Sequence, residues 1–436
     1  MASTVLQHGL GHRRTRRGLR AWVLGALITV VLVMAIAWRA TTESTPPLLV
    51  HRTLAAYVRV PGAAPVLAWP REGQAAVEVE GVGSLGASGA STPVPIASVA
   101  KVMTAYLTLL EHPLPAGAQG FTVTVTPAEV TEQGQRVALD ESTLPVRAGE
   151  RLSERQALQA LMLPSANNIA VLLARYDAGN TAAFVARMNA TARALGMDAT
   201  TYTDPSGFDD TTVSTATDQL KLAHAAMQIP ALRAIVDEPS AVLPVAGRVQ
   251  NYNGLLGSDG YVGVKTGSDS EAGGCLVFAK RTTIGGHALT VLGVVLGQRE
   301  GALVESALLS AQRLGDSAAA SLRVQTVLPA GTGVLSASST DGRSTTAVTA
   351  GALRAIGWGG LVLPVRVLAR PAMRRLRAGE PMAGVTVGGV PVGDVAAGGA
   401  SQGAGAGTGA SGSATSAVAM RSIGSPSLGY RLGHLL

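Results

Sequence analysis

Three short polar motifs, placed between residues 98 and 267, constrain this chain more than any other feature. In chain order they are Ser98-Val99-Ala100-Lys101, Ser165-Ala166-Asn167 and Lys265-Thr266-Gly267. Each motif alone is a weak signal. Together they supply hydroxyls, amines and an amide, which are the groups used in nucleophilic acyl transfer. If they act together, the fold must bring a helix start and a distant strand end to one groove.

Ser98 and Lys101 are the predicted nucleophile and its base. Pro95 precedes an apolar stretch, residues 96–110, that predicts a buried helix. Positions i and i+3 of a helix share a face, so an uncharged Lys101 amine can accept the Ser98 proton. Burial among apolar neighbours would lower the pKa of the lysine, as a base requires. The alternative is a helix-start serine with an incidental lysine one turn later.

The choice of cation favours the functional interpretation. Only four of the 35 basic residues are lysines, and these are Lys101, Lys221, Lys265 and Lys280. Arginine is therefore the default cation of this chain, yet two of the four lysines lie inside the motifs. A compact amine that can lose its proton cannot be replaced there by a guanidinium.

The second and third motifs predict substrate handling. Ser165 can relay a proton to a leaving amine, while Asn167 holds the substrate amide and Lys101. The Lys265 amine and the Thr266 hydroxyl would bind a terminal carboxylate, and Gly267 lets the substrate backbone lie close to the strand. The alternatives are a plain helix cap at Ser165 and a sheet-edge cation followed by a turn.

The apolar patterns predict an α+β fold. Alternating or buried strands are expected at 75–80, 121–125, 262–264, 275–279 and 288–296. Helices are expected at 96–110, 167–179, 181–195, 217–227 and 302–313. This order predicts a helical cluster inserted between the early and late strands of one antiparallel sheet.

An uncharged apolar run at residues 21–38 follows a basic amino end. As a helix it is about 27 Å long, nearly a hydrocarbon core. The basic flank predicts a cytoplasmic amino end and an exported body. We favour an uncleaved anchor over a signal peptide, although Ala35-Ile36-Ala37 resembles a cleavage site. Either way the body is extracytoplasmic.

Charge and ligand patterns exclude several classes of function. The net charge of +7 comes from the amino end, because six arginines and no acidic residue lie among the first 39 residues. The remainder holds 29 basic and 28 acidic residues, so nucleic acid is not an expected partner. The seven histidines show no metal-binding spacing, and Cys275, the only cysteine, reads as part of a buried strand. No metal or other cofactor is expected.

Longer segments of the sequence resemble the low-molecular-mass D-alanyl-D-alanine carboxypeptidases, peptidase family S11. The segments are residues 95–105, 163–170, 204–208 (Asp-Pro-Ser-Gly-Phe) and 263–267. The resemblance covers residues 54–319 and implies the β-lactamase/transpeptidase-like fold. It also implies removal of the terminal D-alanine from peptidoglycan stem peptides, through an acyl-enzyme on Ser98. Penicillins and other β-lactams would acylate the same serine, and the backbone N–H groups of Ser98 and Ser268 would form the oxyanion hole.

The predicted organisation follows from these segments. It comprises a basic cytoplasmic tail (1–20), the apolar segment (21–38), a linker (39–53), the peptidase domain (54–319), a small β-rich module (320–396), a Gly/Ala/Ser insert (397–417) and a tail (418–436). The last residues, 425–436, regain apolar character and suggest a final strand.

Two departures and several alternatives accompany the resemblance. Asp269 follows the third motif, where an acidic group could weaken carboxylate binding, and Asn168 stands where relatives often have an acid. A β-lactamase is disfavoured because the only glutamate between the second and third motifs is Glu238, next to Pro239. An inactive wall-binding or scaffold homologue is a further alternative, as is endopeptidase or transpeptidase action by the same acyl-enzyme.

Overall fold

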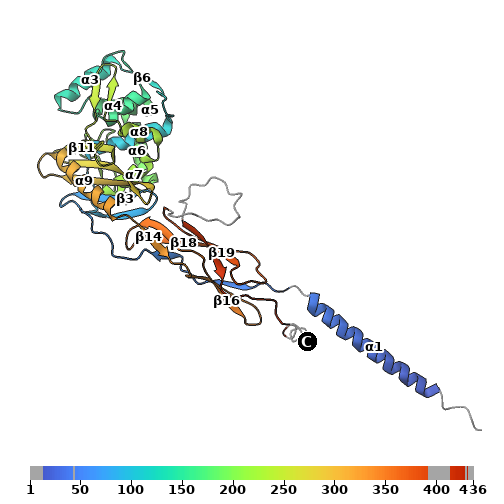
Figure 1. The fold of residues 1–436 in the computed structure, drawn as a ribbon. Coiled ribbons are helices and arrows are strands. Elements are labelled where there is room, and N and C mark those ends of the chain that lie inside the picture. The colour runs from blue at the N-terminus through green and yellow to red at the C-terminus, as the bar shows by residue number, and fades with distance from the viewer. Residues whose placement is uncertain (1–12, 43–44, 391–412, 428–429, 431–436) are drawn as a thin grey trace, which may run out of the picture.

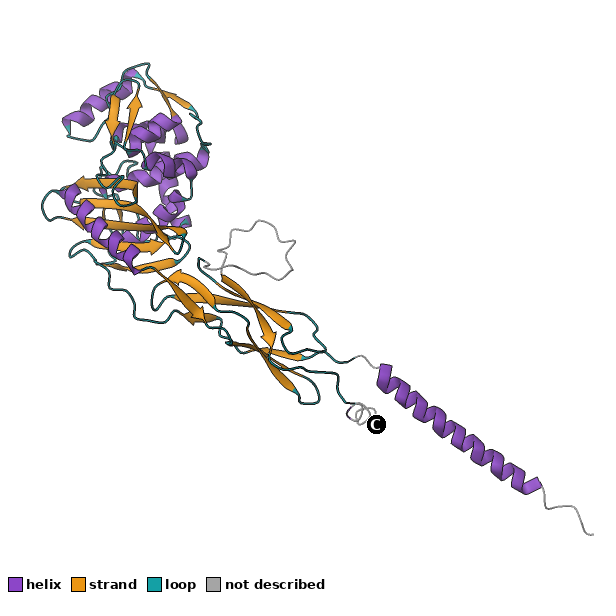
Figure 2. Cartoon of the chain, in the orientation of Figure 1, coloured by secondary structure: helices purple, strands orange, loops and turns teal. Residues whose placement is uncertain are grey.

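Figures 1 and 2 show the computed structural model, which describes residues 13–42, 45–390, 413–427 and 430. A large mixed domain lies at one end and an elongated β module in the middle. A single long helix, α1 (Arg13–Thr42), lies at the other end (Figure 1). Part of the predicted basic tail, residues 1–12, lies outside the described residues. The span from Arg20 to Arg39 is long and apolar enough to cross a membrane, and none of it is buried.

The large domain is built on one antiparallel sheet in the order β11-β12-β13-β3-β4. Its strands are β3 (Gln74–Val79), β4 (Gly83–Ser88), β11 (Tyr261–Asp269), β12 (Gly273–Ile284) and β13 (His287–Gln298). β3 pairs with β13, with Val77 opposite Gly293, so two early strands complete a sheet that three late strands begin. The predicted α+β fold, with helices inserted between the two sets of strands, is confirmed.

Helices lie on both sides of this sheet. The inserted ones are α2 (Lys101–Glu111), α3 (Pro127–Ala138), α4 (Glu154–Met162), α5 (Asn167–Ala178), α6 (Thr181–Ala194), α7 (Ala216–Met227) and α8 (Pro230–Val236). Three short strand pairs lie among them: β5 (Val94–Pro95) with β8 (Val213–Ser214), β6 (Thr122–Thr124) with β7 (Arg151–Ser153), and β9 (Ser240–Leu243) with β10 (Gly247–Gln250). The opposite face is covered by α9 (Leu303–Ser321).

Strand β12 explains the continuous apolar run that includes the single cysteine. Leu276 and Phe278 belong to the core shared with α9, whereas Val277 and Cys275 belong to the core of the inserted helices. Both faces of the strand are therefore buried, which removes the polar alternation of a half-exposed strand. Burial raises the pKa of the Cys275 thiol to about 12, so this cysteine is an inert core residue.

The β module contains strands from both ends of the chain, which differs from the predicted boundaries. Its sheet has the order β1-β15-β16-β20-β19-β18-β2, with β14 and β17 paired beside it. The strands are β1 (Leu49–Arg52), β2 (Tyr57–Arg59), β14 (Arg323–Leu328), β15 (Gly333–Ser338), β16 (Ser344–Thr349), β17 (Leu353–Gly357), β18 (Val362–Ala369), β19 (Pro381–Val387) and β20 (Ser413–Ala419). The linker predicted at 39–53 thus contains β1, and the domain predicted from residue 54 contains β2. Leu48 and Val60, which flank these short strands, are buried in the core of the module.

The carboxy-terminal boundary also differs from the prediction. The insert predicted at 397–417 overlaps β20, which pairs with both β19 and β16. Ala417 and Ala419 are buried there, because β20 lies between two other strands. Residues 391–412 lie outside the described part. The strand suggested at 425–436 is not formed at 425–427, and most of the remaining residues lie outside the described part of the chain.

Because β1 and β2 close the module, we expect a chain that starts at Gly62 to have a less stable module than one that starts at Pro46. Hydrogen exchange in β15 and β18, the partners of the lost strands, should be faster by about tenfold or more in the shorter chain. Exchange in β12 should be equal in both chains and serves as the internal control. Equal protection of β15 in the two chains would show that β1 adds nothing to the module.

Candidate active site

Ser98 and Lys101 lie together at the start of the first inserted helix. Ser98 is half-buried in a 3₁₀ turn, η1 (Ala97–Ala100), and Lys101 is the fully buried first residue of α2. Lys101 Nζ donates to Ser98 Oγ at 2.7 Å and to the carbonyl oxygen of Ser206 at 2.8 Å. Neither η1 nor α2 has a side-chain cap, so Ser98 is not the helix-capping serine of the alternative interpretation.

The environment of Lys101 suits a base at neutral pH. Burial lowers the pKa of Lys101 to about 7, although the nearby carboxylates of Asp204 and Glu141 have the opposite effect and raise it. At pH 7 a substantial fraction of the amine is therefore uncharged. In the same geometry the uncharged amine can accept the Ser98 proton over 2.7 Å.

The loop Asp204–Phe208 holds Lys101 in place. The Asp204 carboxylate accepts hydrogen bonds from the Ser206 hydroxyl at 2.5 Å and from the Gly207 N–H at 3.0 Å, and the Thr104 hydroxyl donates to the Pro205 carbonyl at 2.6 Å. Gly207 has φ +75°, and a Cβ there would lie 1.9 Å from the Ala97 carbonyl oxygen. Only glycine allows this loop to pack so closely against the turn η1.

The second motif presents two buried polar atoms that have no partner among the described residues, Ser165 Oγ and Asn167 Oδ1. Ser165 is in the left-handed region (φ 63°), and the residue that caps α5 is Ala166. The plain-cap interpretation of Ser165 is therefore wrong. Asn167 was also expected to hold Lys101, but Ser206 does so instead, and Asn167 Nδ2 donates to Glu141 Oε2 at 2.8 Å.

Glu141 is a site residue that the sequence analysis missed. Its carboxylate accepts from both Asn167 and Arg136, each at 2.8 Å, and its side chain is almost fully buried. It also raises the pKa of Lys101, so it acts on the first and second motifs at once. Glu141 belongs to no motif and has no characteristic spacing from one, so only the fold reveals it.

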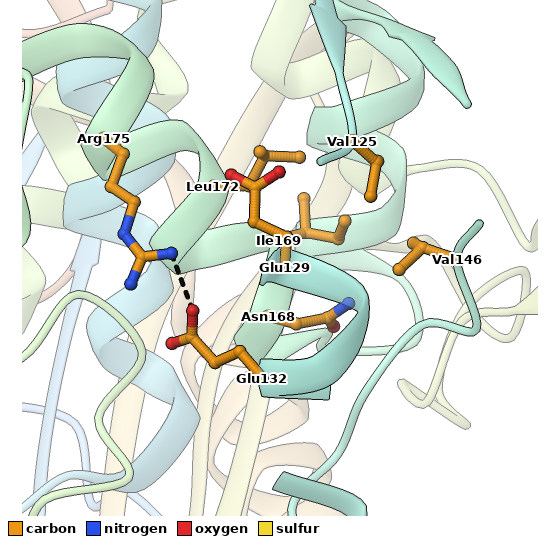
Figure 3. A pocket seen from close by; sticks show the side chains of 8 residues that line it. All are labelled: Val125, Glu129, Glu132, Val146, Asn168, Ile169, Leu172 and Arg175. Atoms are coloured by element: carbon orange, nitrogen blue, oxygen red, sulfur yellow. Dashed lines mark hydrogen bonds and ion pairs between the residues drawn. The ribbon is translucent and has the colours of Figure 1, made fainter. Parts of the chain in front are cut away.

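A ladder of ion pairs extends this arrangement to the surface. Arg136 also pairs with Glu132 at 2.9 Å, and Glu132 pairs with Arg175 of α5 at 2.6 Å. Figure 3 shows the second pair beside a small hollow between α3 and α5. None of the residues lining that hollow belongs to the three motifs. The hollow is thus separate from the three motifs, but the ladder beside it fixes Arg136 and, through it, Glu141.

The third motif approaches Ser98 from the end strand of the sheet. Lys265 is fully buried on β11, and its Nζ donates to the Thr266 carbonyl oxygen at 2.8 Å. Burial, and then the charge of Lys101, hold the pKa of Lys265 well below its usual value. A Cβ on Gly267 would lie 3.0 Å from the backbone nitrogens of Ser98 and Val99. The strand end, including the exposed Ser268, therefore lies directly beside the turn η1.

Asp269, the unusual residue after the third motif, is occupied by the turn that comes next. Its carboxylate accepts from the Glu271 N–H at 2.9 Å and from the Ala272 N–H at 2.6 Å. Burial raises the pKa of Asp269. The charged group that lowers the pKa of Lys265 is Lys101 and not Asp269. Asp269 therefore has a structural role in the turn between β11 and β12. Among the residues that the structure describes, no group of three or more His, Cys, Asp or Glu side chains could hold a metal ion.

Comparison with known proteins agrees with this geometry. The sequence profile of the D-alanyl-D-alanine carboxypeptidases of peptidase family S11 matches residues 77–300. This chain belongs to that family. A D-alanyl-D-alanine endopeptidase of Pseudomonas aeruginosa is 36% identical over 200 residues, which are 44% of this chain and 60% of that protein. A D-alanyl-D-alanine carboxypeptidase of Streptomyces sp. strain K15 is 34% identical over 216 residues, 46% of this chain and 71% of the relative.

Two solved structures extend the comparison. A mutant of the Streptomyces K15 DD-transpeptidase matches with a TM-score of 0.50 and 30% identity, covering 58% of this chain and 98% of the other. The D-alanyl-D-alanine carboxypeptidase DacD of Francisella tularensis matches with a TM-score of 0.55 and 19% identity, covering 83% and 96%. The second likeness is one of fold alone, and it spans more of this chain than the large domain.

The lowered pKa of Lys101 sets the expected pH dependence of Ser98 acylation. Below about pH 7 the amine is protonated and cannot accept the Ser98 proton, so the rate should fall about tenfold per pH unit. The measurement is the second-order rate constant for labelling by a fluorescent penicillin between pH 5 and 9. An inflection near pH 10 would mean that the Lys101 base is an ordinary, solvated lysine.

We expect Glu141→Gln to shift that inflection to lower pH, because the substitution removes a negative charge that raises the pKa of Lys101. It should also slow acylation by about tenfold, since Asn167 loses a charge-assisted hydrogen bond. Glu238→Gln is the matched control, because the Glu238 carboxylate accepts from Gln159 Nε2 at 2.6 Å, outside the motifs. A shift of the same size in both variants would contradict the role assigned to Glu141.

Proposed function

We propose that this protein is a serine-type D-Ala-D-Ala peptidase with Ser98 as its nucleophile. One observation carries the proposal: a half-buried serine hydroxyl lies 2.7 Å from a buried lysine amine whose pKa is about 7. The chain matches 60% of the length of the Pseudomonas endopeptidase and 71% of the length of the Streptomyces carboxypeptidase. The proposed activity therefore rests mainly on the geometry of the site.

The proposed reaction has two halves that share one covalent intermediate. Ser98 Oγ attacks the carbonyl carbon between the last two D-alanines, and its proton passes to Lys101 Nζ. The C–N bond then breaks, and the proton reaches the leaving amine through the Ser165 hydroxyl, which releases D-alanine. Water attacks the resulting ester on Ser98 and gives the shortened peptide with a free carboxylate. The backbone N–H groups of Ser98 and Ser268 are the proposed oxyanion donors.

The third motif is the proposed carboxylate site. Lys265 is buried and pairs with no carboxylate among the described residues, although an uncompensated buried cation is unfavourable. The terminal carboxylate of D-alanine would supply the missing charge, would restore the pKa of Lys265 and would accept from the Thr266 hydroxyl. The unpartnered Asn167 amide oxygen is the proposed acceptor for a substrate N–H.

Carboxypeptidase action is the specific assignment that we propose. The names of the relatives include both carboxypeptidases and endopeptidases, which differ in the group on the leaving side of the scissile bond. A buried amine beside the nucleophile turn favours a small leaving group that ends in a carboxylate, which is free D-alanine. β-Lactams are expected to acylate Ser98 and to leave slowly, because Glu238, the only glutamate between the second and third motifs, has its carboxylate beside Gln159 and Arg155 rather than beside a motif residue.

The proposed location is the outer face of the cytoplasmic membrane, with α1 as an uncleaved anchor. The alternative cleavage pattern, residues 35–37, lies inside α1 rather than after it. The basic residues before the apolar stretch would keep the amino end in the cytoplasm. The large domain would then stand outside the membrane, with the β module between them (Figure 1).

The direct test is release of D-alanine from a pentapeptide ending in D-Ala-D-Ala. Ser98→Ala should lower the rate by about 10³-fold or more, because the covalent route is lost. Ser270→Ala, at an exposed serine just after the third motif, is the control and should keep the rate. Release at the uncatalysed rate by both wild type and Ser98→Ala would identify an idle homologue, and faster cleavage of cross-linked dimers than of pentapeptide would reassign the protein as an endopeptidase.

A further inference from the structure

An arginine-rich loop, residues 370–380, joins β18 to β19 at one end of the β module. Strand β18 begins opposite Arg59 of β2 and runs to Ala369, away from the large domain (Figure 1). We define the arginine surface as the exposed side chains of this loop and of the adjacent end of β20: Arg370, Arg374, Arg375, Arg377 and Arg421. Among the described residues, only Arg370 of these five has a carboxylate partner, Glu380 at 3.3 Å.

Two hydrogen bonds hold this loop beside the segment that follows α1. The Leu48 N–H donates to the Met373 carbonyl oxygen at 2.7 Å, and the Arg374 guanidinium donates to the Thr45 carbonyl oxygen. Thr45 is three residues beyond Thr42, the last residue of α1. Three residues reach at most about 11 Å, so the loop stays near the end of α1 whatever path they take.

That distance places the arginine surface within range of lipid headgroups. The apolar span ends at Arg39, and the helix continues to Thr42, about 4.5 Å further. Thr45, whose carbonyl oxygen accepts from Arg374, therefore lies within about 16 Å of the hydrocarbon core, and the headgroup layer fills roughly 5 to 8 Å of that distance. The remaining gap is comparable to the Debye length of about 8 Å at physiological salt, so the arginines are incompletely screened from lipid charge.

Two exposed apolar side chains accompany the charges. Leu368, at the end of β18, is 74% exposed, and Met420, just after β20, is 60% exposed. The end of β20 is joined to the loop, because the Gly379 N–H donates to the Ala419 carbonyl oxygen at 2.8 Å. Arginines with projecting apolar tips are typical of surfaces that lie on an anionic membrane.

We propose that the arginine surface binds the anionic phospholipid headgroups of the membrane that α1 spans. The proposal rests on the anchoring proposed above and goes beyond it. One helix joined by a short tether leaves the body free to tilt, whereas a second contact at the end of the module holds the module upright. The active site in the large domain is then held at a defined height above the membrane.

The test uses the full chain in nanodiscs of phosphatidylcholine, with and without phosphatidylglycerol. Ala378→Cys, in the loop, carries a fluorophore, while the native Cys275 is buried, and a nitroxide on the lipid headgroup serves as the quencher. Quenching should be about threefold or more stronger in anionic discs and should fall in high salt. The triple variant R375Q/R377Q/R421Q should lose the difference, whereas R323Q/R354Q, on the paired strands β14 and β17, should keep it.

Three results would overturn the proposal. Equal quenching in neutral and anionic discs would exclude headgroup binding while leaving the anchor intact. Tight binding of soluble poly(glycerol phosphate), lost in the triple variant and without any effect of disc charge, would assign the surface to a wall polymer instead. Recovery of the protein outside the discs would refute the anchoring itself, and the lipid contact with it.

Discussion

Removal of the Lys101 amine from water is the interaction on which the active site depends. In water a lysine keeps its proton far above pH 7 and cannot serve as a base. In this fold, burial lowers the pKa of Lys101 to about 7 while its Nζ remains 2.7 Å from Ser98 Oγ. The Asp204–Phe208 loop and the helix α2 enclose the amine without supplying a carboxylate to it directly. A guanidinium could not substitute, because it does not lose its proton.

The sheet brings a second buried amine to the same place. β11 is an end strand of the sheet, and the absence of a side chain at Gly267 lets it approach the backbone nitrogens of Ser98 and Val99. Burial, and then the charge of Lys101, disfavour the charged form of Lys265 and lower its pKa. The proposed site therefore suits a substrate that carries its own negative charge.

Sequence reasoning found the features that appear as particular residue types a few positions apart in the chain. The i, i+3 relation of Ser98 and Lys101 and the scarcity of lysine pointed to the base. The long apolar strands and helices gave the order of elements in the sheet. Glu141 could not be found in this way, because its contacts with Asn167 and Arg136 arise only in the folded chain. The Ser206 carbonyl is a backbone group and has no residue signature at all.

The module boundaries were missed for a different reason. β1 and β2 are too short for alternation to be recognised, and both lie close to the tether. β20 consists mostly of small residues, so its composition resembles that of the insert before it. The boundaries depend on pairing between the two ends of the chain, which local patterns do not encode.

The most direct measurement of the central claim is an NMR titration of selectively labelled lysine side chains. The chain has only four lysines, so each Cε signal can be assigned by a single Lys→Arg substitution. We predict that the Lys101 signal titrates near pH 7 in the free protein. A Lys101 signal that titrates near the ordinary lysine value of about 10.4 would contradict the account, because the amine next to Ser98 would then be fully protonated at neutral pH.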